Sequence, residues 1–328
     1  MTIKLKLSEA SPDLPVSQQL ERQAPFIHSK LAPKCTQAKL IKGELTETDT
    51  DALIRDTLET VELHGRWGYR LQGKTQEGDP LKDKGYLGMG LTYNPNHIDL
   101  TMDPLVDPHE QVQGNHNPGH QGTKEFGSNS GNPYSRVTDP EARRRAVKLN
   151  SHYDTYSMAY RTEGSRHGYL GTFLDSLKRS MVRSSIRIIN AAARGQQMGP
   201  DGAVNSVHRA GVSWHVDESM FENLRINIAV KTDPMFVLEQ HHRKGELFHL
   251  EAPYAYSWDT GVPHRAYATQ QTAEPFYRTH IMLGLAPWWD FDEATGTWTQ
   301  NEFHGKKHPW DMLVDGDIIP GFKLIAEI

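Results

Sequence analysis

The chain has 328 residues and a formal net charge of −5, with 37% hydrophobic and 23% charged residues. This composition is ordinary for a globular protein, and the negative net charge offers no general attraction to nucleic acid. No apolar run approaches the roughly 18 residues that span a bilayer, and the first residues lack the apolar segment of a signal peptide. We therefore expect a cytoplasmic protein that does not act in a membrane. The single cysteine, Cys35, excludes an intramolecular disulfide and a cysteine-rich metal site.

The first segments are predicted to form an arm and a helix. Residues 1–35 contain four prolines, which interrupt helices, so we expect an irregular arm on the surface. Residues 46–65 begin with Thr and Asp, end at Gly65 and carry apolar side chains at helical spacing. These apolar positions are Leu53, Ile54, Leu58 and Val61. The pattern predicts an amphipathic helix.

Residues 109–135 are rich in Gly, Asn, Pro and His and show little apolar periodicity. A long loop of this kind inside a compact protein is disordered or functional. We expect a mobile lid or a substrate-facing loop, with a second metal site at its histidines as the alternative. A helix is predicted to begin at Asp139, with Pro140 at its first position. Another is predicted over residues 168–184, with an apolar stripe at Leu170, Phe173, Leu174, Leu177 and Met181.

From residue 184 the sequence reads as short strands separated by turn signals. The first expected strand covers residues 184–195, and the next surrounds Trp214, after a turn at GPDG (199–202). Further strands are expected in LRINIAV, MFVLEQ, GELFHL, AYAYSW, PHRAYA and FYRTHIMLGL. Their lengths and turns suit a β-sandwich or a jelly-roll barrel. His241 and His242 are expected at an exposed hairpin tip, whereas Arg187 could point into the barrel.

The tail after residue 287 contains Trp288, Trp289, Trp298 and Trp310. We expect this segment to be ordered, because it contains so many aromatic residues. It would pack on the barrel or on a second subunit of a homodimer, and it could also form a roof over an active site.

Four polar residues between 211 and 283 are spaced as a metal site would require. His215 and Asp217 are two positions apart, and in a strand such residues point to the same face. His264 is the best candidate for a third ligand, because it begins a strand after a turn. Two imidazoles and one carboxylate form the facial triad of non-haem Fe(II) oxygenases, with positions left open for a cosubstrate and dioxygen. In a chain with 17 histidines, a His-x-Asp pair alone is weak evidence for a metal site. The position of Arg278, fourteen residues after His264, strengthens that evidence.

Residues 183–286 resemble the double-stranded β-helix core of the 2-oxoglutarate and Fe(II)-dependent oxygenases. Within them, the sequence is most similar to the aspartyl/asparaginyl β-hydroxylase-like group, which includes bacterial free amino acid and proline hydroxylases. The motifs that carry the resemblance are WHVD (214–217), NLRINIAV (223–230), PHRAY (263–267) and YRTHIMLGL (277–285).

The resemblance implies a mainly β fold with flanking helices and a double-stranded β-helix (jelly-roll, cupin-like) core. We expect one integrated domain with three parts. Residues 1–182 would form an N-terminal helical elaboration, residues 183–287 the catalytic core, and residues 288–328 the aromatic tail.

The resemblance also implies roles for individual residues. Three of them would be iron ligands, namely His215, Asp217 and His264. Arg278 would bind the far (C5) carboxylate of 2-oxoglutarate as a bidentate pair. Arg225 matches a position that contacts the carboxylate nearer the metal, and Asn227 stands where many members carry His.

The activity implied by the resemblance is hydroxylation of an unactivated C–H bond in a small amino acid or an amino-acid-derived metabolite. It would use Fe(II), 2-oxoglutarate and O2 and release succinate and CO2. Asp217 argues against the related halogenases, which need a small residue there. The substrate would be a free small molecule, and its carboxylate and amine partners are sought among Arg183, Arg187, Arg209 and Glu218.

Two other classes of protein remain open. One is a cupin-like metalloenzyme that does not use 2-oxoglutarate, in which Arg278 would have no special role. The other is a non-catalytic β-sandwich that binds a ligand or partner through its aromatic tail.

Overall fold

Antiparallel strands form most of the regular structure of the protein, and a few helices flank them. The computed structural model describes residues 2–11, 14–26, 31, 39–64, 67–68, 86–95, 155–192, 196–198, 204–207, 210–215, 217–243 and 245–328. The fold is therefore mainly β, as the sequence predicts. None of the helices in the described ranges is long and apolar enough to cross a membrane.

The largest sheet has eight strands in the order β19-β2-β14-β11-β16-β7-β4-β3. Their bounds are β19 (Phe322–Glu327), β2 (Leu40–Leu45), β14 (Ala255–Trp258), β11 (Leu224–Lys231), β16 (Tyr277–Leu285), β7 (Ser185–Asn190), β4 (Tyr86–Gly90) and β3 (Trp67–Gly68). A second sheet has four strands in the order β10-β15-β12-β13. These are β10 (Gly211–His215), β15 (His264–Ala268), β12 (Phe236–Gln240) and β13 (Phe248–His249).

Three smaller sheets complete the strand pairing of the described ranges. One joins β1 (Lys4–Lys6), β18 (Thr297–Gln300) and β17 (Trp289–Asp292). The other two pair β5 (Thr92–Tyr93) with β6 (Tyr160–Arg161), and β8 (Gln196–Met198) with β9 (Val204–Val207). The turn predicted at 199–202 lies outside the described residues.

The eight-stranded sheet packs a different hydrophobic cluster on each face. Ile186 and Ile188 of β7 belong to the main core, together with side chains of α2 (Thr50–His64) and α5 (Gly168–Ser176). Ile189, one position further, packs instead with Phe236 and Ala268 of the four-stranded sheet. This alternation follows from the two-residue period of a strand. The two sheets consequently face each other, and the helices cover the opposite face of the larger one.

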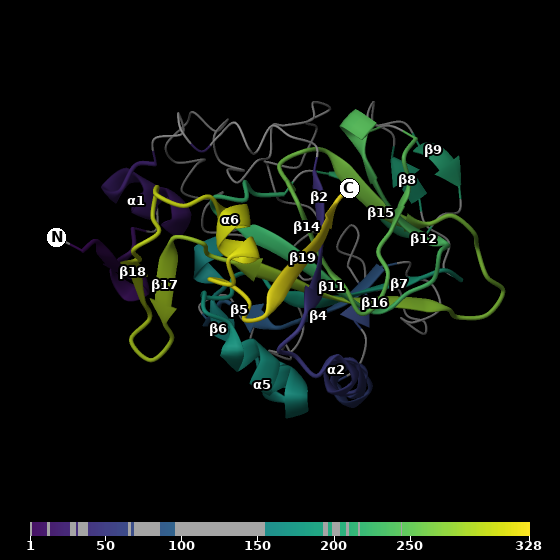
Figure 1. Ribbon diagram of the computed structural model, residues 1–328, viewed down its shortest axis with the longest axis horizontal. Helices are drawn as coiled ribbons and strands as arrows, with labels where there is room; N and C mark the ends of the chain where they lie inside the picture. The colour runs from purple at the N-terminus through teal and green to yellow at the C-terminus, as the bar shows by residue number, and fades with distance from the viewer. Residues whose placement is uncertain are drawn as a thin grey trace.

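Figure 1 shows this layering, with α2 and α5 below the strands of the large sheet and β12 and β15 above its strands β7 and β16. At one end of the space between the two sheets, Leu238 of the small sheet packs against Leu40, Tyr256 and Trp258 of the large one. Each fully buried aliphatic side chain of this kind contributes roughly 1.5–3 kcal/mol to folding. Apolar packing at both ends of the interface thus fixes the spacing of the polar groups between them.

The strands predicted after residue 184 are confirmed, and so is the helix predicted over 46–65, which begins at Thr50. His241 and His242 lie in a short 3-10 turn, η9 (His241–Arg243), and are exposed as expected. The other 3-10 turns among the described residues are η1 (Leu7–Glu9), η7 (Thr155–Ser157) and η8 (Gly164–Arg166). The helix predicted from Asp139 and the loop at 109–135 lie outside the described residues.

Two predictions for segments before residue 185 are wrong in detail. The helix expected over 168–184 ends at Ser176, because the chain beyond it joins the large sheet: Val182 N–H donates to the Gly284 carbonyl at 2.8 Å. The arm expected over 1–35 contains helix α1 (Val16–Gln23). The prolines flank this helix rather than interrupt it, since Pro15 is its N-cap.

The C-terminal tail is ordered and contributes to the core. All four of its tryptophans are buried: Trp288, Trp289, Trp298 and Trp310. Trp310 belongs to α6 (Pro309–Val314), and its indole N–H donates to Ser257 Oγ of β14 at 3.3 Å. Strand β19 then pairs with β2 at the edge of the large sheet.

Candidate functional site

A cavity of about 50 Å³ lies between the two sheets, and polar side chains from both of them line it. Five of the six residues predicted to bind iron or cosubstrate are on its wall, together with one further arginine. These residues are Asp217, His264, Arg225, Asn227, Arg278 and Arg187. The fold thus gathers side chains from four strands and one loop that are up to 91 positions apart in the chain.

His264 is the first residue of β15, and only 4% of it is exposed. Its Nδ1 lies 2.9 Å from the carbonyl oxygen of Val262. Because a carbonyl can only accept, Nδ1 must carry the hydrogen, and Nε2 is the nitrogen with the lone pair. A metal-binding histidine usually has this arrangement, with the second ring nitrogen donating to a carbonyl or carboxylate. The Trp258 ring packs edge-on against the imidazole, with centroids 5.7 Å apart.

Asp217 lies just beyond the end of β10, where its backbone N–H donates to the Thr260 carbonyl at 2.9 Å. One of its carboxylate oxygens is 3.9 Å from Arg225 Nε. His215 is the last residue of β10, and its Cα is directly opposite that of His264 in the antiparallel register. The side chain of His215 is outside the described ones. Among the side chains that are described, no three or more His, Cys, Asp or Glu form a metal-binding group.

Arg225 is held by a buried network centred on Glu218. Its Nη2 lies 3.2 Å from Glu218 Oε2, and its Nη1 donates to the Arg183 carbonyl at 2.8 Å. The carboxylate of Glu218 also forms an ion pair with the Arg183 side chain and accepts from Thr155 Oγ1 at 3.1 Å. Glu218 and Arg183 were candidates for binding a substrate. In the structure they form an ion pair with each other, beside Arg225.

Arg278 is held by a histidine that sequence reasoning did not single out. Arg278 Nε donates to His280 Nε2 at 2.9 Å, and its Nη2 lies 2.6 Å from the other ring nitrogen. His280 is fully buried, and burial lowers its pKa well below the ordinary value, with the charge of Arg278 adding to the effect. The imidazole is therefore neutral and can accept from the guanidinium. The i, i+2 spacing of the two residues on β16 is the signal that could have revealed this pair.

Arg187 lies on β7 and is 8% exposed, opposite His280 of β16 in register. Burial and, to a lesser degree, the charge of Arg225 lower its pKa to about 9, with Asp217 opposing the shift. The guanidinium remains charged at neutral pH, but the fold destabilises that charge. The cavity wall thus carries three guanidinium groups and one carboxylate.

Other groups on the wall complete a pocket with a polar and an apolar side. Leu238, Ala266 and Met282 are apolar, and Asn227 is buried beside them. Trp258 also lines the cavity, and its indole N–H has no hydrogen-bond partner among the described residues. A buried donor without a partner costs roughly 1–3 kcal/mol, so an acceptor atom of a ligand would be stabilised there.

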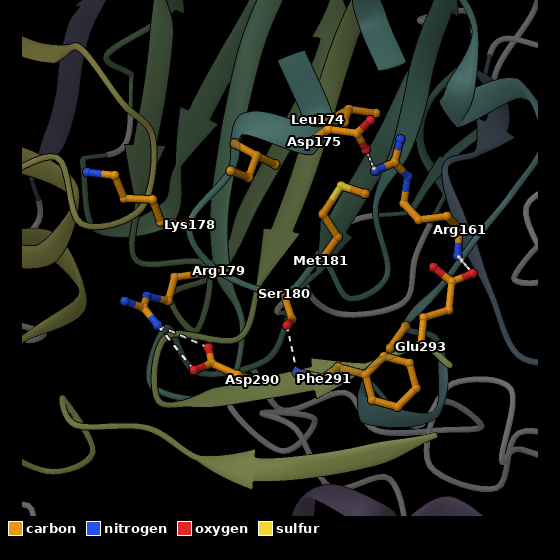
Figure 2. Close-up of a pocket in the computed structure, with 12 residues that line it drawn as sticks. Arg161, Leu174, Asp175, Lys178, Arg179, Ser180, Met181, Asp290, Phe291 and Glu293 are labelled. Carbon is orange, nitrogen blue, oxygen red and sulfur yellow. Dashed lines mark hydrogen bonds and ion pairs between the residues drawn. The ribbon is translucent and has the colours of Figure 1, made fainter. Parts of the chain in front are cut away.

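A larger cavity, of about 330 Å³, opens on another part of the surface, between the segments around α5 and β17. Figure 2 shows that its charged side chains pair with one another: Arg161 with Asp175 and Arg179 with Asp290, each at 3.0 Å. Lys178 Nζ donates to the Gly316 carbonyl at 2.8 Å. The charges around this cavity are thus balanced by one another, whereas the described residues that line the cavity between the sheets include three arginines and one carboxylate.

No protein-family model and no curated protein matches this chain. The functional assignment therefore depends on the chemistry of the site.

Proposed function

We propose that the protein is an Fe(II)- and 2-oxoglutarate-dependent dioxygenase that hydroxylates a C–H bond of a small amino acid or an amino-acid-derived metabolite. The observation that carries the proposal is the convergence of Asp217, His264 and Arg278 on one cavity between the sheets. A metal ligand pair and a dicarboxylate anchor must lie within one cosubstrate length of each other for this chemistry. Their common cavity supports that requirement.

The strand connectivity supports a double-stranded β-helix for the core. Along the chain, β7 belongs to the large sheet, β10 to the small one, β11 to the large one and β12 to the small one. The alternation continues through β14, β15 and β16. A chain that crosses repeatedly between two facing antiparallel sheets is the pattern of a jelly-roll.

The residues of the cavity fit a bound Fe(II). A neutral imidazole with Nε2 as the lone-pair nitrogen and a carboxylate are ligands that non-haem Fe(II) sites use. His264 and Asp217 supply these two groups. The backbone position of His215, opposite His264, supports it as the third ligand.

The residues that line the cavity also suit a bound 2-oxoglutarate. The planar guanidinium of Arg278, oriented by His280, suits bidentate binding of the far carboxylate. The indole N–H of Trp258, which has no hydrogen-bond partner among the residues that the structure describes, supplies a donor for an oxygen of a ligand. Arg225 and Asn227, on the same wall, support the end nearer the metal.

When bound, Fe(II) and 2-oxoglutarate would activate O2 for oxidation of an unactivated C–H bond, with release of succinate and CO2. The protein's own residues would orient the iron ligands and exclude water from the cavity. The Val262 carbonyl fixes the tautomer and the ring orientation of His264. Leu238, Ala266 and Met282 exclude water from the reacting side, which protects reactive species from side reactions.

Substitution of the two histidines tests the metal assignment. His215→Ala and His264→Ala should each lose tight Fe(II) binding in anaerobic calorimetry while keeping the wild-type circular dichroism spectrum. His242→Ala, at the exposed hairpin tip, is the matched control and should bind iron as the wild type does. Tight Fe(II) binding by either His215→Ala or His264→Ala would rule out the proposed iron ligands.

A further inference from the structure

Trp258 is a buried tryptophan whose indole N–H has no hydrogen-bond partner in the part of the chain that the structure describes. Only 5% of the residue is exposed. The tryptophans of the tail differ, because the indole N–H groups of Trp288, Trp298 and Trp310 each donate to a protein oxygen at 2.9–3.3 Å. A buried indole usually has such an acceptor.

The packing of the Trp258 ring does not explain why an indole stands at this position. The ring belongs to an apolar cluster that includes Leu40, Leu238 and Leu250. A phenyl ring would also pack against these side chains, and it would bury no donor. Trp258 lines the cavity between the two sheets as well. The buried donor therefore points to an acceptor atom that binds in the cavity.

Trp258 lies at the end of the cavity where the iron is proposed to bind. Its ring packs edge-on against the imidazole of His264, with centroids 5.7 Å apart. Strands β11 and β14 pair with Asn227 opposite Tyr256. One same-face step from this pair, in the antiparallel direction, leads to Arg225 on β11 and to Trp258 on β14.

Arg278 lies toward the opposite end of the large sheet. It is near the start of β16, whereas Gly284, opposite Arg225 in register, is near the end of that strand. Arg225 Nε lies 3.9 Å from a carboxylate oxygen of Asp217, the proposed carboxylate ligand. With the far carboxylate of 2-oxoglutarate assigned to Arg278, the carboxylate next to the keto group falls at the end that holds Trp258.

We infer that the indole N–H of Trp258 donates a hydrogen bond to the carboxylate of 2-oxoglutarate that lies next to the keto group. This inference rests on the proposed function. A 2-oxo acid that chelates a metal through its keto oxygen and one carboxylate oxygen keeps its second carboxylate oxygen free to accept. A hydrogen bond to a carboxylate is stronger than one between neutral groups, and the exclusion of water strengthens it further.

The test measures binding to the full-length protein, loaded anaerobically with Fe(II), by calorimetry. Three probes are used, of which 2-oxoglutarate carries both carboxylates and 2-oxopentanoate lacks the far one. The third, acetohydroxamate, chelates iron through its two oxygens and has no further oxygen to accept a hydrogen bond. The variants are Trp258→Phe, Arg278→Gln and the matched control Trp310→Phe. Trp310 belongs to the main core, and its N–H donates to Ser257 Oγ at 3.3 Å.

We expect Trp258→Phe to raise the Kd values of 2-oxoglutarate and 2-oxopentanoate by a similar factor of about tenfold or more, the range of a hydrogen bond to a charged group. The affinities for Fe(II) and acetohydroxamate should stay at the wild-type values. Arg278→Gln should weaken 2-oxoglutarate and leave 2-oxopentanoate unchanged, because it acts at the other end. Trp310→Phe should change none of these affinities. If Trp258→Phe does not fold, Trp258→Met takes its place, since Met also lacks the N–H and adapts to irregular space.

Three results would overturn the inference. The first is an unchanged Kd of 2-oxoglutarate in the folded Trp258 variant. The second is an equal loss of acetohydroxamate binding, which would make the packing of the ring the cause. The third is a loss for 2-oxoglutarate that is absent for 2-oxopentanoate, which would assign the N–H to the far carboxylate. Failure of the wild type to bind Fe(II) and 2-oxoglutarate is a separate result, and it would refute the proposed function itself.

Discussion

Replacing His280 by Leu should weaken 2-oxoglutarate binding without touching the metal. His280 accepts a hydrogen bond from Arg278 Nε at 2.9 Å, and Leu fills a similar volume but offers no acceptor. A hydrogen bond to a charged group contributes roughly 1.5–3 kcal/mol. Because the Arg278 guanidinium is buried, part of this energy should be lost from the stability of the folded protein. The rest should be lost from 2-oxoglutarate binding, since the guanidinium is then less well oriented.

We take about half to two thirds of the hydrogen-bond energy to come from holding the Arg278 guanidinium in the orientation that binds 2-oxoglutarate. Losing it would weaken 2-oxoglutarate binding by about 1–2 kcal/mol, which raises the Kd roughly fivefold to thirtyfold. The assay is anaerobic calorimetric titration of 2-oxoglutarate into Fe(II)-loaded protein. Affinity for Fe(II) should stay at the wild-type value. His280→Gln, whose side-chain oxygen can accept from Arg278, should recover part of the loss.

His242→Leu is the matched control, because it makes the same substitution at an exposed histidine. It should leave the Kd for 2-oxoglutarate unchanged. A folded His280→Leu protein with the wild-type Kd would refute the idea that His280 orients Arg278 for the cosubstrate.

Two further predictions concern stability and do not depend on the proposed function. Gly284 is opposite Arg225 in register, and a Cβ added there would collide with the Val182 carbonyl oxygen. Gly284→Ala should therefore lower the free energy of unfolding, measured in urea, by about 1–3 kcal/mol. An unfolding midpoint equal to that of the wild type would contradict this close packing. Burial raises the pKa of Asp259 from 3.8 to about 6, although the Gly261 N–H opposes the shift, so this carboxyl adds stability at low pH that is lost as pH rises through about 6. At pH 8 the free energy of unfolding of metal-free Asp259→Asn should exceed that of the wild type by up to about 3 kcal/mol, and near pH 4 the two values should match. An equal difference at both pH values would contradict the shift in pKa.

Local pattern was enough to predict most of the strands. Alternation and turn residues are encoded over a few positions, so β11, β15 and β16 were found from LRINIAV, PHRAYA and FYRTHIMLGL. The helix at 168–184 was overextended because its apolar spacing continues to Met181. Pairing of that segment with Leu285 ends the helical conformation, and this long-range contact leaves no mark in the local sequence.

The candidate site was predictable where strand period and residue order carry the information. The sequence predicts His264, Asp217 and Arg278 as residues of one site, and the three line one cavity. The contacts of Glu218 were not predictable, since they include residues far away in the chain, such as Thr155, 63 positions away. His280 could have been named, because the same-face rule places it beside Arg278.

The central claim is that one cavity holds both Fe(II) and 2-oxoglutarate, and an anaerobic absorption titration tests it most directly. Fe(II) and then 2-oxoglutarate are added to metal-free protein, and the visible spectrum is followed for the weak metal-to-ligand charge-transfer band of the chelate. We predict a band that saturates at one equivalent of iron and is lost in Arg278→Ala at matched concentrations. Iron binding without any band on addition of 2-oxoglutarate would contradict it and favour a metalloenzyme that does not use this cosubstrate.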